Sequence, residues 1–283
     1  MHILLPPSEG KTTPVDGPVL DLDGLPYPEL TAARQQVLEA LIAVSNRDDA
    51  GEILGVGGRI MPEVVAQRDI LSAHCAPARE VYTGVLYEAA QLRSGDDVLI
   101  FSGLFGVTTG EDLIPAYRLS MNVSLPGIGS LKAFWRRELA QTGLGDSNCR
   151  QADSGTRRRD AWNPASGNRP GDAEMQSETN KVNTAETSMT QTGVDMRSGA
   201  YRVTAPRGDW WDLRVVDSRG KVITHAAKHY RGLLARALLD AERAQGSVPG
   251  DAALIDVAQV AGALGRIEIM HDGLRHHVTL ILE

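Results

Sequence analysis

Apolar residues along this chain of 283 residues form short blocks that predict a mixture of strands and helices. Residues 2–5 (HILL) and 97–101 (DVLIF) are continuous apolar runs, which are typical of buried strands. Helical spacing of apolar residues predicts helices over 28–45, 79–92, 130–141, 226–244 and 251–264, with Asp251 as the N-cap of the last. Hairpins are expected for 211–216 with 221–224 and for 266–270 with 276–282. Because strands and helices mix without regular alternation, we predict an α/β (mixed α+β) fold with a mixed sheet.

The stretch from about residue 144 to 193 departs from this pattern. It is rich in Ser, Thr, Asn and Gln and has almost no branched apolar residues. Such a segment cannot bury enough surface to offset the entropy lost on ordering, so we expect it to be disordered. A structureless loop of this length is uncommon inside a domain. We therefore interpret residues 1–283 as a single domain that is interrupted by an insert, and not as two linked domains.

Composition limits the possible partners. The formal net charge is −7, whereas dedicated nucleic-acid binders usually carry a positive balance. Any contact with phosphates must therefore come from a local concentration of Lys and Arg. No run of about eighteen apolar residues is present, so we expect no membrane span, and the first residues are predicted to be a strand and not a signal peptide. Cys75 and Cys149 lie far apart, which favours a cytoplasmic protein without a structural disulfide.

Two glycine-containing turns follow the predicted strands. Residues 7–12 (PSEGKT) resemble a phosphate loop, although the earlier glycine of that motif is missing. They are either a solvated surface loop or part of an anion-binding site. Ser102 to Gly106 (SGLFG) ends the second strand, where ligand sites of α/β proteins collect. The alternative is a simple sharp turn, and the GxSxG pattern of a serine nucleophile is absent.

Four cations are candidates for a basic cleft: Lys11, Arg118, Lys228 and Arg231. Lys228 and Arg231 are three residues apart on one predicted helix and so face the same way. The alternative is that each cation pairs with a carboxylate on a solvated face. Glycine turns at 53–59 and 125–133 could each be a hairpin whose amides approach a DNA phosphate, or an ordinary turn between helices. His and Cys residues show no repeated ligand spacing, so we predict neither a metal site nor a cofactor.

Seven segments in order strengthen one interpretation: LLPPSEGKT, VYTGVLYEA, LIFSGLFGV, DLIPAYRLSM, LKAFWRREL, VDMRSGAY and AKHYRGLLARALL. Together they resemble the YaaA family of peroxide-stress proteins, from residue 1 to about 240. The resemblance implies a cytosolic protein that is made during hydrogen peroxide stress, keeps free iron low and limits oxidative DNA damage. It also implies one compact mixed α/β body with a positively charged cleft and a helix-hairpin-helix element that binds DNA.

The resemblance also implies which residues form the DNA or ligand cleft. These are Ser8, Lys11, Thr12, Tyr82, Thr83, Ser102, Gly103, Gly106, Tyr117, Arg118, Ser198, Tyr201, Lys228 and Arg231. By order, the hairpin element lies near residues 51–62, with Gly55, Gly57 and Gly58, which makes the turn at 127–129 the less favoured choice. The insert and Pro62, at the start of the second hairpin helix, depart from the family pattern.

Three functions remain open at this stage. The leading hypothesis is a monomeric protein that contacts the DNA backbone through Lys11, Arg118, Lys228 and Arg231 without reading sequence. The alternative is an enzyme that acts on a small phosphorylated or nucleobase-containing substrate, with Ser102, Tyr117 and Tyr201 in its site. Direct iron sequestration is the least supported, because the sequence lacks a His and carboxylate cluster of the kind iron sites use.

Overall fold

The computed structural model describes residues 1–144, 193–206, 208–245 and 256–282. Residues 1–146 and 190–283 belong to one compact unit, and residues 147–189 form a second unit outside the described part of the chain. The expected insert therefore lies almost wholly outside the described residues, as do Cys149 and Asp251. The interpretation as one interrupted domain stays a prediction.

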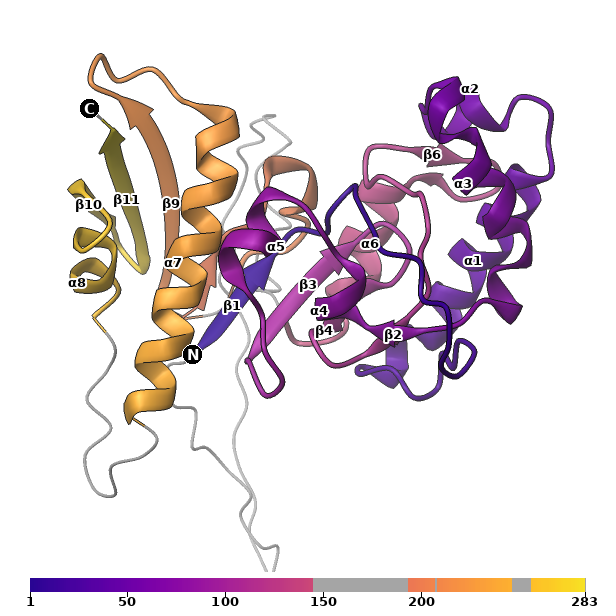
Figure 1. The fold of residues 1–283 in the computed structure, drawn as a ribbon, viewed down its shortest axis with the longest axis horizontal. Coiled ribbons are helices and arrows are strands. Elements are labelled where there is room, and N and C mark those ends of the chain that lie inside the picture. The colour runs from indigo at the N-terminus through magenta and orange to yellow at the C-terminus, as the bar shows by residue number, and fades with distance from the viewer. Residues whose placement is uncertain (145–192, 207, 246–255, 283) are drawn as a thin grey trace, which may run out of the picture. The chain divides into compact units, whose positions relative to one another are not determined.

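A seven-stranded mixed sheet organises the described residues, which confirms the mixed α/β class (Figure 1). The strand order is β10-β11-β9-β8-β1-β3-β4. The five strands from β11 to β3 are parallel to their neighbours, and β10 and β4 are antiparallel edge strands. The strands of this sheet are β1 (His2–Leu5), β3 (Val98–Ser102), β4 (Gly106–Thr109), β8 (Gly193–Asp195), β9 (Trp210–Asp217), β10 (Arg266–Asp272) and β11 (Arg275–Leu282).

Helices and short strands complete the unit. In chain order the α-helices are α1 (Thr31–Ser45), α2 (Ala50–Leu54), α3 (Met61–Ala66), α4 (Ala78–Val81), α5 (Val85–Ala90), α6 (Leu131–Leu139), α7 (Thr224–Gln245) and α8 (Val257–Gly262). The 3-10 helices are η1 (Pro28–Leu30), η2 (Gly58–Ile60), η3 (Gln67–Ser72) and η4 (Gly199–Tyr201). Two small two-stranded sheets pair β2 (Ala76–Pro77) with β5 (Leu113–Ile114), and β6 (Ser124–Leu125) with β7 (Gly129–Ser130).

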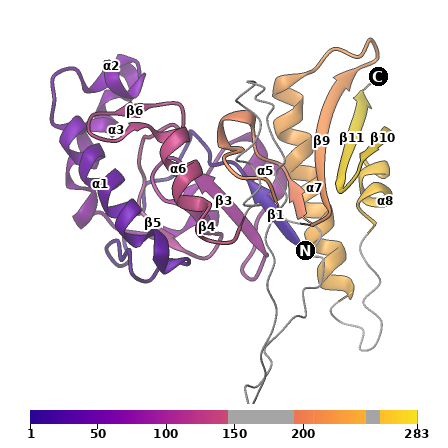
Figure 2. The same ribbon diagram turned by 180° about the vertical axis from the view of Figure 1, so that it is seen from behind.

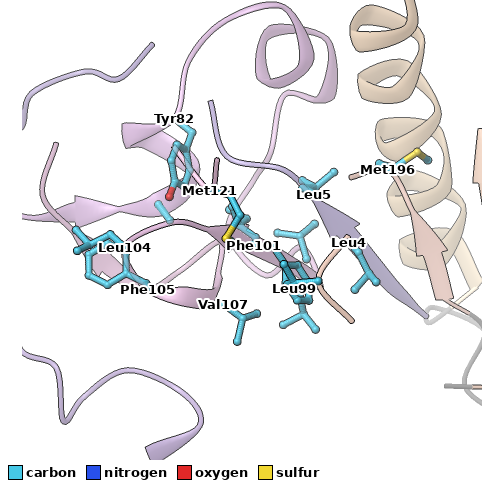
Figure 3. Close-up of a cluster of buried hydrophobic side chains, with 14 of the residues drawn as sticks. Leu4, Leu5, Tyr82, Leu99, Phe101, Leu104, Phe105, Val107, Met121 and Met196 are labelled. Carbon is cyan, nitrogen blue, oxygen red and sulfur yellow. The ribbon is translucent and has the colours of Figure 1, made fainter. Parts of the chain in front are cut away.

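The core lies around β1 and β3. All five residues of β3 are buried, as expected for a strand that is covered on both faces. Figure 3 shows Leu4 and Leu5 of β1 beside Leu99 and Phe101 of β3. Helix α7 packs against both β9 and α5, and Figure 2 shows the molecule from behind, with α6 beside β3 and β4. The chain segments that follow β1 and β3 are thus attached to a rigid base.

Three sequence predictions need correction. The helix expected over 79–92 is broken into α4 and α5, because Gly84 has a φ of 94° that no helix contains. Residues 221–224 are not a strand: only Val222 forms a bridge to β9, and α7 already begins at Thr224, because β9 takes β8 and β11 as its partners. The described part of the last helix begins at Val257, and its N-cap is Asp256.

Candidate functional site

Three adjacent parallel strands, β8, β1 and β3, end at the same edge of the sheet. The segments that follow them are 196–202, 6–12 and 102–106, and eight of the fourteen predicted cleft residues lie on these segments. Ligand sites of α/β proteins collect at the carboxyl ends of parallel strands. The sheet topology therefore brings the predicted residues to the edge where chemistry is expected.

Lys11 lies at the centre of this edge. The loop that carries it is tied to the turn between α4 and α5, since the Thr83 amide donates to Gly10 at 3.1 Å and the Thr12 amide donates to Val81 at 2.9 Å. The Lys11 Nζ donates to the Ser8 carbonyl at 2.7 Å. It also lies 4.4 Å from the centre of the Tyr117 ring and 5.4 Å from that of Tyr82, which are cation–π distances.

Burial lowers the pKa of Lys11 from 10.5 to about 7. The positive charge of Arg118 contributes to this lowering, whereas the nearby carboxylates of Glu63 and Glu9 oppose it. Desolvation prevails because neither carboxylate forms an ion pair with the amine in the described part of the chain. Near neutral pH, Lys11 therefore exists as a mixture of ammonium and free amine, and it can accept or give up a proton.

Two phenols and a serine stand beside this amine. The hydroxyls of Tyr82 and Tyr117 hydrogen-bond to each other at 2.7 Å, and the Ser102 side chain lies close to both. The Ser102 hydroxyl also accepts from the Phe105 amide at 3.1 Å, which fixes its position at the end of β3. Burial raises the pKa of both tyrosines far above neutral, so both stay protonated and can donate. We call Lys11, Tyr82, Tyr117 and Ser102 the lysine–tyrosine cluster.

The neighbouring predicted residues extend this cluster. The Ser8 hydroxyl donates to the carbonyl of Thr83, and this bond joins the loop after β1 to the turn before α5. Tyr201, on η4, lies near Ser120 and Met121 and within electrostatic range of Tyr117. Thr12 is exposed beside Lys11, and Ser198 precedes η4 with no side-chain cap. Tyr201 thus brings the segment after β8 toward the same region.

The two predicted glycines of the β3 turn serve packing. A Cβ atom on Gly103 would lie 2.8 Å from the Leu119 carbonyl. Gly106 has a φ of 71°, and a Cβ there would lie 2.6 Å from the ring of Trp135. The Trp135 Nε1 donates to the Gly103 carbonyl at 2.8 Å, and the buried Arg34 donates to the carbonyls of Phe105 and Val107. These contacts hold the turn that carries Ser102.

The four predicted cations do not act alike. Arg118 forms an ion pair with Glu63 of α3, including a bond of 3.0 Å, as the paired-surface alternative expects. Lys228 is exposed on α7, whereas Arg231, on the same helix, is largely buried. Within the described ranges, no hydrogen bond, ion pair or ring contact joins Lys228 or Arg231 to the lysine–tyrosine cluster.

The predicted hairpin glycines lie between two short helices. Gly55 ends α2 with a φ of 65°, and Gly57 and Gly58 lead into η2 and α3. A Cβ atom on any of the three would meet nothing within 4 Å, so the backbone there is open to its surroundings. Pro62 occupies the first turn of α3, where a proline is tolerated. The neighbouring Arg59 is exposed.

Sequence reasoning missed a second polar cluster, which contains Asp195, Arg197, Arg202, Asp212 and His277. One signal was available, because a charged residue such as Asp195 in a short apolar strand requires a buried partner. Among the described residues, no group of three or more His, Cys, Asp and Glu side chains is placed to hold a metal ion. None of the described helices combines the length and the apolar character that a membrane crossing requires.

Comparison with known proteins identifies the family. The sequence model of the family described as peroxide stress protein YaaA matches residues 1–150. The chain belongs to this family. A UPF0246 protein of Corynebacterium efficiens is 33% identical over the full length of both chains. A UPF0246 protein of Streptomyces coelicolor is 43% identical over 152 residues, which cover 50% of this chain and 58% of that relative.

A more distant relative is an uncharacterised protein of Campylobacter jejuni, 22% identical over 83% of this chain. The relation to the peroxide-stress family, predicted from seven segments, is thus confirmed. Residues of the lysine–tyrosine cluster all lie within the part of the chain that the family model matches.

Proposed function

We propose that this YaaA-family member limits free iron and oxidative DNA damage by binding and converting a small phosphorylated or nucleobase-containing ligand at the lysine–tyrosine cluster. The observation that carries the proposal is the Lys11 amine, buried against two phenol rings and without a carboxylate partner among the described residues. An amine whose pKa lies near neutrality is suited to general acid–base chemistry. Structural lysines on a solvated surface keep their charge and offer no such chemistry.

The roles within the cluster follow from protonation. Lys11, as the free amine, would accept a proton from the bound ligand, and as the ammonium it would attract a phosphate. Tyr117 and Tyr82 remain protonated. One phenol donates to the other, and the second phenol would donate to a ligand oxygen that gains negative charge. Ser102 lies beside both phenols. The cluster thus pairs a titrating base with donors that do not titrate.

The test is to restore peroxide resistance to a bacterium that lacks its own YaaA-family protein. We expect Lys11→Met and Tyr117→Phe to fail to restore survival or to lower chelatable iron, measured by electron paramagnetic resonance of whole cells. Lys221→Met, which removes an exposed lysine outside all the predicted site residues, is the matched control and should restore both. If Lys11→Met restores both as well as the wild type does, the cluster is not the working site.

A ligand screen tests the chemistry directly. Equilibrium dialysis with nucleoside monophosphates and triphosphates should show binding to the wild type that Lys11→Met weakens. Lys11→Met and Tyr117→Phe must both keep the circular dichroism spectrum of the wild type, so that loss of folding is distinguished from loss of the site. Absence of binding for every nucleotide would contradict the proposed ligand class.

A second candidate function is DNA binding by the α2–η2–α3 segment. It is favoured by the open backbone at Gly55, Gly57 and Gly58 beside the exposed Arg59. Glycine amides at a turn between helices can approach a phosphate closely. Glu63 of α3 also pairs with Arg118, the residue after Tyr117, which connects this segment to the cluster. Because backbone amides would make these contacts, binding at this segment would not require a positive net charge of the whole chain.

Fluorescence anisotropy with duplex DNA at two salt concentrations separates the two candidates. DNA binding by this segment predicts salt-sensitive affinity that Arg59→Ala lowers and Lys11→Met leaves unchanged. Arg219→Ala, on the exposed turn after β9, is the matched control. If the wild type shows no binding at low salt, the DNA candidate is rejected and the small-ligand function stands alone.

A further inference from the structure

Three polar side chains lie side by side across the middle of the sheet. The strand register pairs Asp195 of β8 with Asp212 of β9, and Asp212 with His277 of β11. Residues paired in adjacent strands point to the same face of a sheet. The His277 Nδ1 lies 2.9 Å from an oxygen of Asp212, so the carboxylate orients the imidazole. This row consists of residues that are remote in the sequence.

Two arginines neutralise the carboxylates of this row. Arg197, which is fully buried, forms a two-pronged bond to Asp195 at 2.9 and 3.0 Å and lies over the ring of Phe101. Arg202 donates to Asp212 at 3.1 Å and lies 3.6 Å from Asp195. Each aspartate therefore already pairs with one arginine, and neither carboxylate remains free to pair with a further cation.

A third arginine enters the same cluster from α7. Arg231 donates only a long bond of 3.4 Å, to the Leu213 carbonyl, and no carboxylate of the described residues pairs with it. Its Nε is buried and has no acceptor in that part of the chain. Burial lowers the pKa of Arg231 and the nearby Arg202 lowers it further, while Asp195 and Asp212 oppose both effects.

The charges of this cluster do not balance. Arg197, Arg202 and Arg231 carry three positive charges, against two negative charges on Asp195 and Asp212. A buried charge without a partner is costly, so an uncompensated guanidinium favours an anion from outside. Solvent reaches the cluster, because the side chains of Arg202 and His277 are 32% and 31% exposed. A ligand could therefore approach Arg231 from the side of these two residues.

We propose that Arg231, Arg202 and His277 bind the phosphate group of a small molecule, as a site separate from the lysine–tyrosine cluster. A guanidinium presents its N–H donors in a fork that matches phosphate oxygens. Two guanidinium groups beside an imidazole have more hydrogen-bond donors than the carboxylates of the cluster can accept from. The site goes beyond the proposed function, which rests on Lys11. The segment from Ser198 to Arg202 connects the two, since Tyr201 contacts one region and Arg202 the other.

Isothermal titration calorimetry with inorganic phosphate and pyrophosphate, at constant ionic strength, tests the site in the full-length chain. We expect Arg231→Met to weaken binding about tenfold or more, as the loss of charge-assisted hydrogen bonds predicts. Arg214→Met, which removes an exposed arginine of β9, should leave the affinity unchanged. Arg231→Lys should recover part of the affinity, because it restores the charge without the fork.

Thermal unfolding gives a second readout that a merely structural arginine would not produce. Without phosphate, Arg231→Met should unfold at the same or a higher temperature than the wild type, because it removes an uncompensated buried charge. Added phosphate should raise the midpoint of the wild type and leave that of the variant unchanged. Equal phosphate response in both proteins, or no binding to the wild type, would overturn the site.

Lys11→Met distinguishes the second site from the lysine–tyrosine cluster. The variant should lose any phosphate binding at the lysine–tyrosine cluster but keep, with wild-type affinity, the binding that Arg231→Met weakens, since Lys11 does not contact the second cluster within the described ranges. If Lys11→Met and Arg231→Met abolish phosphate binding alike, the two clusters form one site and the proposal of a separate site is wrong.

Discussion

At the scale of single residues, the environment of Lys11 decides its chemistry. The amine has one strong acceptor, the Ser8 carbonyl, and two aromatic faces, Tyr82 and Tyr117. Ring faces attract an ammonium, but they compensate less than water does for the loss of hydration. The pKa therefore falls to about 7 although Glu63 and Glu9 raise it. The proton that the Lys11 amine gains or loses therefore affects both the proposed chemistry and the stability of the fold.

Replacing Lys11 by Met should change how stability depends on pH. Because the folded pKa lies below the unfolded value, unfolding takes up a proton between pH 7 and 10.5, and rising pH stabilises the wild type over that interval. Below pH 7 the cost of burying the ammonium is fully present. The stability of Lys11→Met relative to the wild type should thus fall by on the order of 5 kcal/mol from acidic to alkaline pH.

Urea unfolding at a series of pH values measures this difference. Lys228→Met should show a constant offset from the wild type, since Lys228 is exposed. A constant offset for Lys11→Met as well would mean that the amine titrates as it does in water.

At the scale of elements, the approach of α5 and α7 depends on one glycine. A Cβ on Gly232 would lie 2.3 Å from the Leu86 carbonyl and 2.7 Å from the Ala89 Cβ. Both are atoms of α5 that cannot move without shifting the helix. Gly232 lies in AKHYRGLLARALL, one of the seven segments that resemble the YaaA family, and the structure shows that it lets two helices come into contact.

Gly232→Ala should destabilise the protein by about 3 kcal/mol, at the upper end of the cost of overpacking. Gly57→Ala is the matched control, because a Cβ there meets nothing within 4 Å and the φ of −81° suits alanine. The free energies of unfolding of the two variants, from urea titration, make the comparison. Equal stability of both variants would show that α5 and α7 can separate at little cost.

The sequence predicts features that depend on neighbouring residues and misses those that depend on residues far apart in the chain. The strand 97–101 and the helices carrying Trp135 and Arg231 were predicted correctly, because periodicity is local. The break at Gly84 depends on the distant loop that carries Lys11. The row Asp195, Asp212 and His277 depends on the register of three parallel strands, which no local pattern encodes.

At the scale of the whole molecule, a long segment of the sequence separates the first strands of the sheet from β8. Helix α6 ends at Leu139, and β8 begins only at Gly193, yet β8 pairs with β1 on one side and β9 on the other. The backbone hydrogen bonds of β8 therefore depend on both partners. The cost of closing this connection depends on its length, if the segment 147–189 behaves as the disordered insert that its composition predicts.

Replacing residues 147–189 by a Gly/Ser linker of about ten residues should then stabilise the remaining unit by roughly 1 kcal/mol, because a shorter flexible loop loses less entropy on closure. The control is a Gly/Ser linker of the same length as the segment, which should leave the free energy of unfolding unchanged. A segment that packs on the rest of the chain gives the opposite sign, since both replacements would then remove favourable contacts and destabilise the protein. Urea unfolding of the three proteins therefore distinguishes a passive insert from a structural one by the direction of the change alone.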